Sequence, residues 1–290
     1  IPHRQSHGYG LSIAGIDAVI QEYHPSLIIC VDNGIVAREA IKYAQQKKID
    51  VIVIDHHLKD TTKNPANAVI HSIATAGAGL TWFFSKELVR ELKFSFDPNS
   101  TLELAAIGTV TDLVPLLGIN RSLVKFGLEN LQHTSRLGLQ SLINIAGLKN
   151  NLLDTYHLGF HIGPRLNAMG RLEHAIDSLR LLCTKKIDQA QKLAKLLNDT
   201  NHERQELTDN LTEIALELAQ SQKNNPVIIV QHSDFHEGII GLIASKLVQK
   251  FWRPAIVLAL NEKIYKASAR SIPGFNIIEA IRHNEDLLES

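Results

Sequence analysis

The sequence predicts an α/β protein in which a parallel sheet is buried between helices. Two apolar runs, LIICVD at 27–32 and VIVIDHH at 51–57, have the length and uniform hydrophobicity of strands covered on both faces. A helical stretch at 37–48 separates them, which is the crossover connection that parallel neighbours need. The chain has 290 residues, of which 44% are hydrophobic, so we expect one large and one small domain.

The other elements follow from hydrophobic periodicity and turn residues. In the first half we expect further helices at 16–23, 77–92, 101–109 and 121–146. Residues 186–222 lack Pro and Gly and have helical apolar spacing, so they form either one long helix or two with a kink near Asn198. After the polar segment QKNNP we expect a strand at 227–232, a helix at 238–251, a strand at 255–260, a hairpin arm at 264–270 and a last helix from about 276.

This order predicts three parts of the chain. They are a first α/β domain at 1–185, a connecting long helix at 186–222 and a smaller α/β domain at 223–290. The chain opens with Ile1 and runs at once into the turn sequence HGYGLS, so we expect both ends to be cut from a longer protein.

Composition limits the class of protein. Thirty basic residues balance thirty acidic ones, so any site for a polyanion must be a local concentration of charge. The two cysteines, Cys30 and Cys183, lie far apart, which indicates neither a disulfide framework nor a thiolate zinc site and fits a reducing cytoplasm. No apolar run reaches the roughly 18 to 20 residues that span a bilayer, and the first residues lack the order of a signal peptide.

Polar side chains follow both predicted strands. Asp32 comes directly after LIICV, and Asp55, His56 and His57 come at the end of VIVIDHH. In open α/β sheets ligands bind at the carboxyl ends of the strands. Asp112 follows an apolar helix in GTVTD, and carboxylates with imidazole but no thiolate suit Mg²⁺ or Mn²⁺. Taken singly, Asp32 can be a turn residue, Asp112 a helix cap and the histidine pair an ordinary loop.

At these residues the sequence resembles the RecJ-type exonucleases of the DHH phosphoesterase superfamily. VIVIDHHLKD resembles the Asp-His-His motif of the superfamily, and CVDNGI and IGTVTDLVPL resemble two further metal-binding motifs. The resemblance continues, in the same order, through HGYGLS, LGFHIGPRLNAMGRLEHA, NHERQEL, HEGIIGLIASKL and ASARSIPGF. It therefore covers nearly the whole chain.

The resemblance implies a catalytic DHH domain, a long connecting helix and a smaller DHHA1 domain. The implied metal ligands are Asp32, His56 and Asp112, with His57 as a catalytic residue and Asp55 orienting a neighbouring imidazole. The implied activity is that of a metal-dependent phosphodiesterase, a 5′ to 3′ exonuclease on single-stranded DNA with a role in repair and recombination. The implied cofactor is a pair of Mn²⁺ or Mg²⁺ ions.

Two motifs of such enzymes are absent from the 290 residues. An Asp-x-Asp motif that supplies ligands to the metal pair is expected before Ile1, and a Gly-Gly-His motif is expected after Ser290. A two-metal mechanism needs both ions held at fixed spacing. We therefore expect the 290-residue piece by itself to be nearly inactive.

Phosphate-binding candidates lie in the later motifs. Arg165 and Arg171 in GPRLNAMGR offer planar bidentate donors, although an ion pair between domains would also explain them. His236 precedes a helix whose first amides form an anion site, or else only a capping turn. Arg270 and Ser271 in ASARS complete the set, while His7, His24 and His71 are expected to be ordinary surface or core residues.

Two other functions remain open at this point. A DHH nanoRNase or cyclic-dinucleotide phosphodiesterase shares the metal motifs, but GPRLNAMGR favours the RecJ type. A non-catalytic nucleic-acid-binding scaffold is the second alternative, and the intact acidic and histidine residues argue against it. Oligomeric state, protein partners, the preferred metal and the choice between DNA and RNA do not follow from the sequence.

Overall fold

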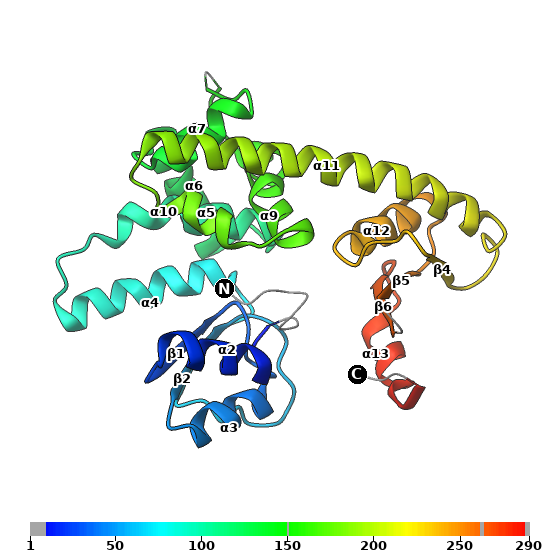
Figure 1. The fold of residues 1–290 in the computed structure, drawn as a ribbon, viewed down its shortest axis with the longest axis horizontal. Helices are drawn as coiled ribbons and strands as arrows, with labels where there is room; N and C mark the ends of the chain where they lie inside the picture. Colours follow the sequence, from blue (N-terminus) through cyan, green and yellow to red (C-terminus); the bar gives the residue numbers. More distant parts are fainter. Residues whose placement is uncertain (1–9, 150, 262–263, 288–290) are drawn as a thin grey trace. The chain divides into compact units, whose positions relative to one another are not determined.

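The computed structural model describes residues 10–149, 151–261 and 264–287. Residues 7–9 of the expected HGYGLS turn, including His7, lie outside these residues. The chain divides into two compact units. Unit 1 comprises residues 1–167 and 174–198, and unit 2 comprises residues 168–173 and 199–290 (Figure 1).

Unit 1 is built on a parallel three-stranded sheet, which confirms the predicted α/β class. The strands β1 (Leu27–Val31), β2 (Asp50–Asp55) and β3 (Ala68–His71) lie in that order, and β2 pairs in parallel with both neighbours. In this register Val31 pairs with Ile54 and Asp55 pairs with His71. β3 was not predicted from the sequence, because its apolar run of Ala68, Val69 and Ile70 is only three residues long.

Helices lie on both faces of this sheet, but the expectation that both strands are covered on both faces is wrong for β1, because Leu27, Ile29 and Val31 on one of its faces are 41–45% exposed. α2 (Ile13–Tyr23) and α3 (Arg38–Gln46) pack Ile16, Ile41 and Ala44 against Val51 and Val53 of β2. α4 (Gly77–Leu92) contacts β1 and β2, and Figure 1 shows it on the side of the sheet opposite α3. Successive side chains of a strand point to opposite faces, so an apolar β2 between two helical layers is the expected arrangement.

A layer of helices completes unit 1. Its members are η1 (Pro98–Thr101), α5 (Leu102–Thr111), α6 (Gly118–Gln132), α7 (Leu137–Ile145), α8 (Thr155–His157), the π turn η2 (Leu158–Ile162), the first half of α9 (Gly163–Leu172) and α10 (Ile176–Cys183). α5 and α6 approach closely, since a Cβ added at Gly127 would lie 2.4 Å from that of Ala106.

The helical region predicted at 121–146 is divided into two helices, α6 and α7. The chain leaves the helix after Gln132 because Thr134 forms a local turn, in which its hydroxyl accepts a hydrogen bond from the amide of Arg136. The same hydroxyl donates to the buried carboxylate of Glu103, so a tertiary contact supports the break.

The long helical region forms one helix, α11 (Ile187–Gln220), so the alternative of two helices with a kink at Asn198 is wrong. Both units contain part of α11, as they do of α9. The proposed division of the chain at residue 222 therefore differs from the split into compact units, and it stays a proposal.

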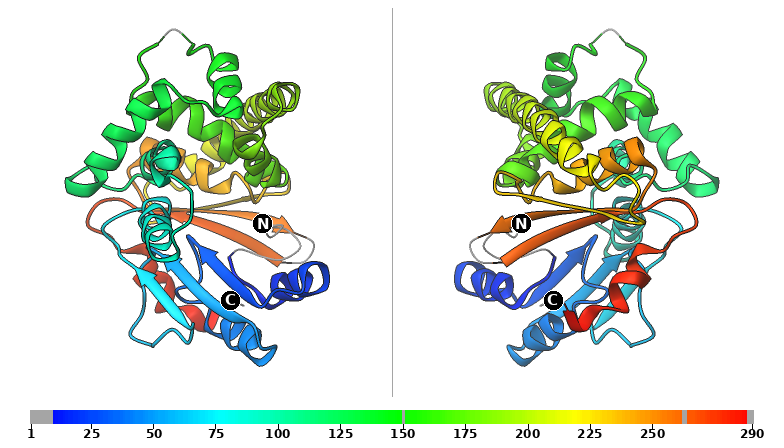
Figure 2. Two further views of the ribbon diagram at one scale, coloured as in Figure 1. Left: turned by 90° about the vertical axis from the view of Figure 1, so that its left-hand side faces the viewer. Right: turned by 90° about the vertical axis from the view of Figure 1, so that its right-hand side faces the viewer.

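Unit 2 contains a second three-stranded sheet. β4 (Ile228–His232) and β5 (Ala255–Asn261) are parallel, while β5 and β6 (Ile264–Arg270) form the expected antiparallel hairpin. α12 (Ile240–Phe251) packs on this sheet, and α13 (Ile277–Arg282) and η3 (Glu285–Leu287) follow it. The last two strands are the orange ribbons in Figure 2.

The outer edge of β4 is occupied by a side chain. The amide of Gln222 donates to the carbonyl of Ile229 (2.7 Å) and its oxygen accepts from the Ile229 N–H (3.0 Å). Gln222 thus occupies both outward backbone groups of that strand residue. Within the described part of the chain, no helix is both long and apolar enough to cross a membrane.

Candidate metal centre

Asp32 and His56 meet at one edge of the parallel sheet because of the strand register. Asp32 directly follows β1, and its N–H donates to the carbonyl of Ile54 in β2 (2.8 Å). His56 leaves the same edge two residues later. Asp112 reaches this place from another layer, as the residue that ends α5.

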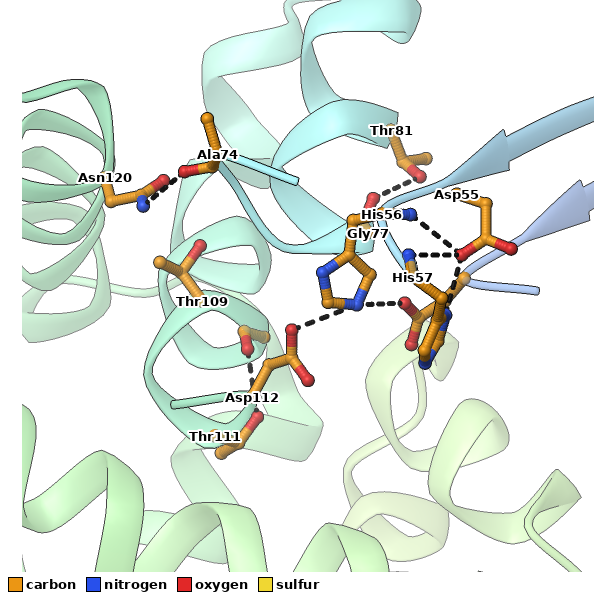
Figure 3. Close-up of polar contacts among 12 residues, drawn as sticks. Asp55, His56, His57, Ala74, Gly77, Thr81, Thr109, Thr111, Asp112 and Asn120 are labelled. Atoms are coloured by element: carbon orange, nitrogen blue, oxygen red, sulfur yellow. Dashed lines mark hydrogen bonds and ion pairs between the residues drawn. The ribbon is translucent and has the colours of Figure 1, made fainter. Parts of the chain in front are cut away.

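The imidazole of His56 lies between two carboxylates. Its Nε2 is 3.1 Å from Oδ1 of Asp32 and 3.2 Å from Oδ2 of Asp112 (Figure 3). The predicted convergence of these three side chains is therefore confirmed. Nε2 is buried, yet neither contact has the angular geometry of a hydrogen bond. A buried nitrogen without a hydrogen bond, facing two carboxylates, is the arrangement expected of a ligand set for a divalent cation.

Asp55 and His57 form a second pair beside the first. Oδ1 of the buried Asp55 accepts from Nδ1 of His57 (2.7 Å), and Oδ2 accepts from the N–H of Ile35 (2.9 Å). Burial opposes ionisation of Asp55, but these bonds and those from the amides of His56 and His57 outweigh it and lower its pKa below the ordinary value. Asp55 thus orients His57, in line with the role expected for it.

The pKa of His57 is shifted in the opposite direction to that of Asp55. Burial of the ring disfavours its charged form, but the hydrogen bond and the charge of Asp55, with smaller contributions from Asp32 and Asp112, raise its pKa above the ordinary value. Together with Asp32 and His56, His57 forms a group whose ligand atoms lie within 4.8 Å of one another. Its ring is half exposed, so it remains accessible to a substrate.

Burial and the neighbouring carboxylates raise the pKa of Asp32, although His56 and His57 act against them. Burial is the largest cause, and the negative charges of Asp112 and Asp55 add to it. Two carboxylates held this close together repel each other, and a bound cation would relieve that repulsion.

The backbone is strained on both sides of the cluster. Asp32 has a φ of 62° and Leu113, the residue after Asp112, has a φ of 58°. Asp tolerates the left-handed region, but Leu does so rarely, and Leu113 is also 87% exposed. Such strain accumulates where the surrounding structure must aim a functional side chain.

Sequence reasoning missed three residues that shape this site. His71 on β3, expected to be ordinary, lies with Nε2 2.8 Å from the carbonyl of His57. Gly77 lies against Asp32, because a Cβ there would be 2.4 Å from Oδ1 and 2.8 Å from Cγ of that side chain. Buried Asn120 donates to the carbonyl of Ala74 (Figure 3) and to that of Pro115, which ties the entry of α4 to the segment after Asp112.

The phosphate-binding candidates lie in both units. In unit 1, Arg165 donates from Nε to Asn198 (3.1 Å) and from Nη1 to the carbonyl of His161 (2.8 Å). In unit 2, Arg171 donates to the carbonyl of Gly238 (3.1 Å).

The remaining candidates, His236, Arg270 and Ser271, make hydrogen bonds with nearby backbone groups. The carbonyl of His236 accepts from the amides of Ile239 and Ile240, which precede and begin α12. Arg270 donates to the adjacent carbonyl of Ala269, and the hydroxyl of Ser271 donates to the carbonyl of Phe275. Their role with phosphate stays a proposal.

Family models match two parts of the chain. Residues 1–109 match the DHH family, N-terminal domain, and residues 224–288 match the DHHA1 domain. The metal-centre residues Asp32, His56 and His57 fall in the first match.

Individual relatives match over nearly the whole chain. The single-stranded-DNA-specific exonuclease RecJ of Bacillus subtilis is 38% identical over 99% of the chain, and its Escherichia coli counterpart is 32% identical over 99%. The chain spans 37% of the first protein and 54% of the second.

Solved structures agree with this match. A crystal structure of exonuclease RecJ bound to manganese superposes with a TM-score of 0.85 at 31% identity, covering 100% of this chain and 74% of that one. A structure of RecJ from Thermus thermophilus in complex with Mn²⁺ gives a TM-score of 0.83 at 31% identity, covering 91% of this chain and 40% of that one. Matching domains, sequence and fold together show that the chain belongs to the RecJ exonuclease family of DHH phosphoesterases.

Proposed function

We propose that the protein carrying this chain is a divalent-metal-dependent exonuclease that degrades single-stranded DNA from the 5′ end, with a role in DNA repair and recombination. The observation that carries the proposal is the buried Nε2 of His56, which faces Asp32 and Asp112 without a hydrogen bond. The names of the relatives give the substrate class, and the direction of degradation rests on the family resemblance alone.

Asp32, His56 and Asp112 are proposed to hold Mn²⁺ or Mg²⁺. The donors fit these ions, since carboxylate oxygens suit both and imidazole suits Mn²⁺. When bound, such ions activate water and neutralise charge on the phosphate. Two of the solved RecJ structures are bound to manganese and a third is in complex with Mg²⁺.

His57 and Asp55 are proposed to act together at the scissile phosphate. Asp55 accepts a hydrogen bond from Nδ1 of His57, which keeps a proton on that nitrogen and fixes the orientation of the ring. The other ring nitrogen is then directed away from Asp55. From there it can donate a hydrogen bond to a phosphate oxygen or move a proton at that atom.

Arg165, Arg171, His236, Arg270 and Ser271 are proposed as phosphate contacts along the strand. Guanidinium groups suit this role because they bind phosphate oxygens in a bidentate manner. The overall charge of the chain is balanced, so affinity for a polyanion must come from such local groups. A cytoplasmic location is also proposed, on the basis of two cysteines that form no disulfide.

The test is cleavage of labelled 5′-phosphorylated single strands by the complete gene product with Mn²⁺ or Mg²⁺. We expect products to shorten from the 5′ end and duplex DNA to resist. Parallel reactions with single-stranded RNA, a dinucleotide and a cyclic dinucleotide cover the other phosphodiesterase functions. Preferred cleavage of a dinucleotide over a long strand, or cleavage without divalent ions, would refute the proposal.

A further inference from the structure

Unit 1 exposes a pair of stacked aromatic rings on a segment that packs against α5. Tyr156 in α8 is 57% exposed and Phe160 in η2 is 68% exposed. Their ring centroids are 4.8 Å apart at an interplanar angle of 27°. We call Tyr156 and Phe160 the ring pair. Rings of this size normally contribute buried area, so two stacked rings left in solvent are a candidate binding surface.

The ring pair stands on an anchored support. Leu158 and Ile162, at the two ends of η2, are completely buried, while Phe160 between them is exposed. Asp154 caps α8 by accepting hydrogen bonds from the N–H (3.0 Å) and Nδ1 (2.6 Å) of His157. The local backbone is a π turn, a form that is frequent at functional sites. The exposure of the rings is therefore set by a packed turn.

The rim of the ring pair is polar and basic. Tyr156 has the rings of His157 and His161 as neighbours, with centroids at 6.1 and 5.6 Å. Arg165 donates to the carbonyl of His161, which brings a guanidinium group to the same turn. Aromatic faces bordered by imidazole and guanidinium groups match a nucleotide, which presents a flat base and an anionic phosphate.

The turn η2 and the first residue of α9 pack against α5, the helix that Asp112 follows. A Cβ added at Gly163 would lie 2.2 Å from Cγ2 of Thr111, and one at Gly159 would lie 3.7 Å from Cγ1 of Val110. Thr111 and Val110 form the last turn of α5, which Asp112 ends. The ring pair and the metal centre thus belong to neighbouring packed segments of one compact unit.

We propose that the ring pair stacks against a base of the single strand whose phosphate is held at the metal centre. The inference rests on the proposed function. It adds a contact to a base, which the proposed metal ligands and arginines, as phosphate-binding groups, do not supply. Stacking accepts every base, because each has a π face, and it requires an unpaired strand. It therefore gives preference for single strands without preference for sequence.

The decisive variant is Phe160→Leu, which removes the ring and keeps an apolar side chain. We expect the KM for Mn²⁺-dependent cleavage of a single strand by the complete gene product to rise about 5- to 100-fold, with a smaller change in kcat. Phe160→Trp should restore the KM. Phe94→Leu, at another exposed phenylalanine of unit 1, is the matched control and should leave the KM unchanged. Thermal unfolding of each variant reports whether the fold is intact.

A strand with abasic sites separates stacking from charge. Binding measured by fluorescence anisotropy without divalent ions should be weaker for Phe160→Leu than for the unaltered protein on a normal strand. The two proteins should bind equally where the bases near the 5′ end are missing. Photocrosslinking of strands that carry 5-iododeoxyuridine should give an adduct at Tyr156 or Phe160.

The outcomes distinguish this inference from the proposed function. If the unaltered protein cleaves single strands and Phe160→Leu has the same KM, the stacking is refuted and a protein partner becomes the candidate ligand of the ring pair. Adducts found only elsewhere in the chain would refute it as well. If the unaltered protein neither binds nor cleaves single strands, the proposed function itself is refuted.

Discussion

The two ends of α5 each carry a carboxylate, and the surroundings of the two differ. At its first turn, buried Glu103 accepts a hydrogen bond from Thr134 (3.0 Å) and lies 2.8 Å from Nε of Arg136. Directly after its last turn, Asp112 faces Nε2 of His56, which also lies 3.1 Å from Oδ1 of Asp32. The first carboxylate accepts a hydrogen bond from a hydroxyl and pairs with one permanent cation, although Nε of Arg136, like Nε2 of His56, makes no hydrogen bond of good geometry. The second carboxylate shares one imidazole nitrogen with another carboxylate.

This difference separates a structural carboxylate from a functional one. A buried charge that is paired and hydrogen-bonded is satisfied within the protein. Two carboxylates around one imidazole nitrogen carry excess negative charge, and a cation bound from solution would balance it. The comparison therefore predicts that changes at the first end of α5 affect stability and that changes at the last end affect activity.

The largest expected effect is on catalysis, from Asp112→Asn. Loss of a proposed metal ligand should lower Mn²⁺-dependent cleavage by more than the roughly 10- to 100-fold typical of residues that only support a ligand. Thermal stability of the metal-free protein should not fall, because a repelling charge has been removed. Glu103→Gln is the matched control and should retain most of the activity. Equal losses of activity in the two variants would remove the distinction between the ends of α5.

A smaller loss of metal affinity is expected from Gly77→Ala. The added methyl would meet Oδ1, Cβ and Cγ of Asp32 within 2.8 Å, so the carboxylate must move. We expect Mn²⁺ affinity, measured by isothermal titration calorimetry, to fall about 10- to 100-fold. At Gly241, also near the start of a helix, an added methyl meets the flexible ends of Ser268 and Arg270, so Gly241→Ala should leave Mn²⁺ affinity unchanged. Unchanged affinity in Gly77→Ala would show that Asp32 is not held by this contact.

The next effect is on stability, from Arg136→Met. Arg136 also donates to the carbonyls of Leu182 and Ser100, so its removal leaves Glu103 and two carbonyls with fewer partners. Its side chain is partly exposed, so the loss should be about 1–3 kcal/mol of unfolding free energy, below that of a fully buried pair. Chemical denaturation measures this loss. Arg90→Met, at an exposed arginine of α4, should cost far less.

The smallest effect is a pH dependence that originates at Glu103. Burial raises its pKa above the ordinary 4.5, while Thr134 and Arg136 lower it in part. A raised folded-state pKa means that the folded protein binds this proton more tightly. The corresponding stabilisation is complete below pH 4.5 and is lost as the pH rises through the folded-state pKa. Relative to Glu103→Gln, the unaltered protein should therefore lose thermal stability as the pH rises from 4.5 through the folded-state pKa of Glu103. A constant difference between the two proteins from pH 4.5 upward would contradict the raised pKa.

Much of the fold follows from local sequence signals. β1, β2, α4 and the β5–β6 hairpin lie within a few residues of their predicted ranges because each has strong periodicity or clear turn residues. β3 was missed because a strand of four residues is too short to show a hydrophobic periodicity. The break between α6 and α7 was missed because it depends on the contact of Thr134 with Glu103, which are 31 positions apart.

The candidate site shows the same limit. Asp32, Asp55, His56 and His57 could be predicted to share one edge because strand ends in a parallel sheet meet there. The supporting residues could not be predicted, since a glycine or a buried asparagine has no distinctive pattern. Gly77 is recognisable only from its contact with Asp32, and Asn120 only from the two carbonyls that it joins.

The side chain of Gln222 has a consequence for association between molecules. An uncovered strand edge can pair with an edge of another copy, which is a common start of aggregation. By bonding to both outward backbone groups of Ile229, Gln222 acts as a one-residue substitute for a neighbouring strand. Intermolecular β-pairing through β4 would first have to break those two bonds. The second sheet thus has a local barrier against growing at that edge, supplied by a single amide from the segment that follows α11.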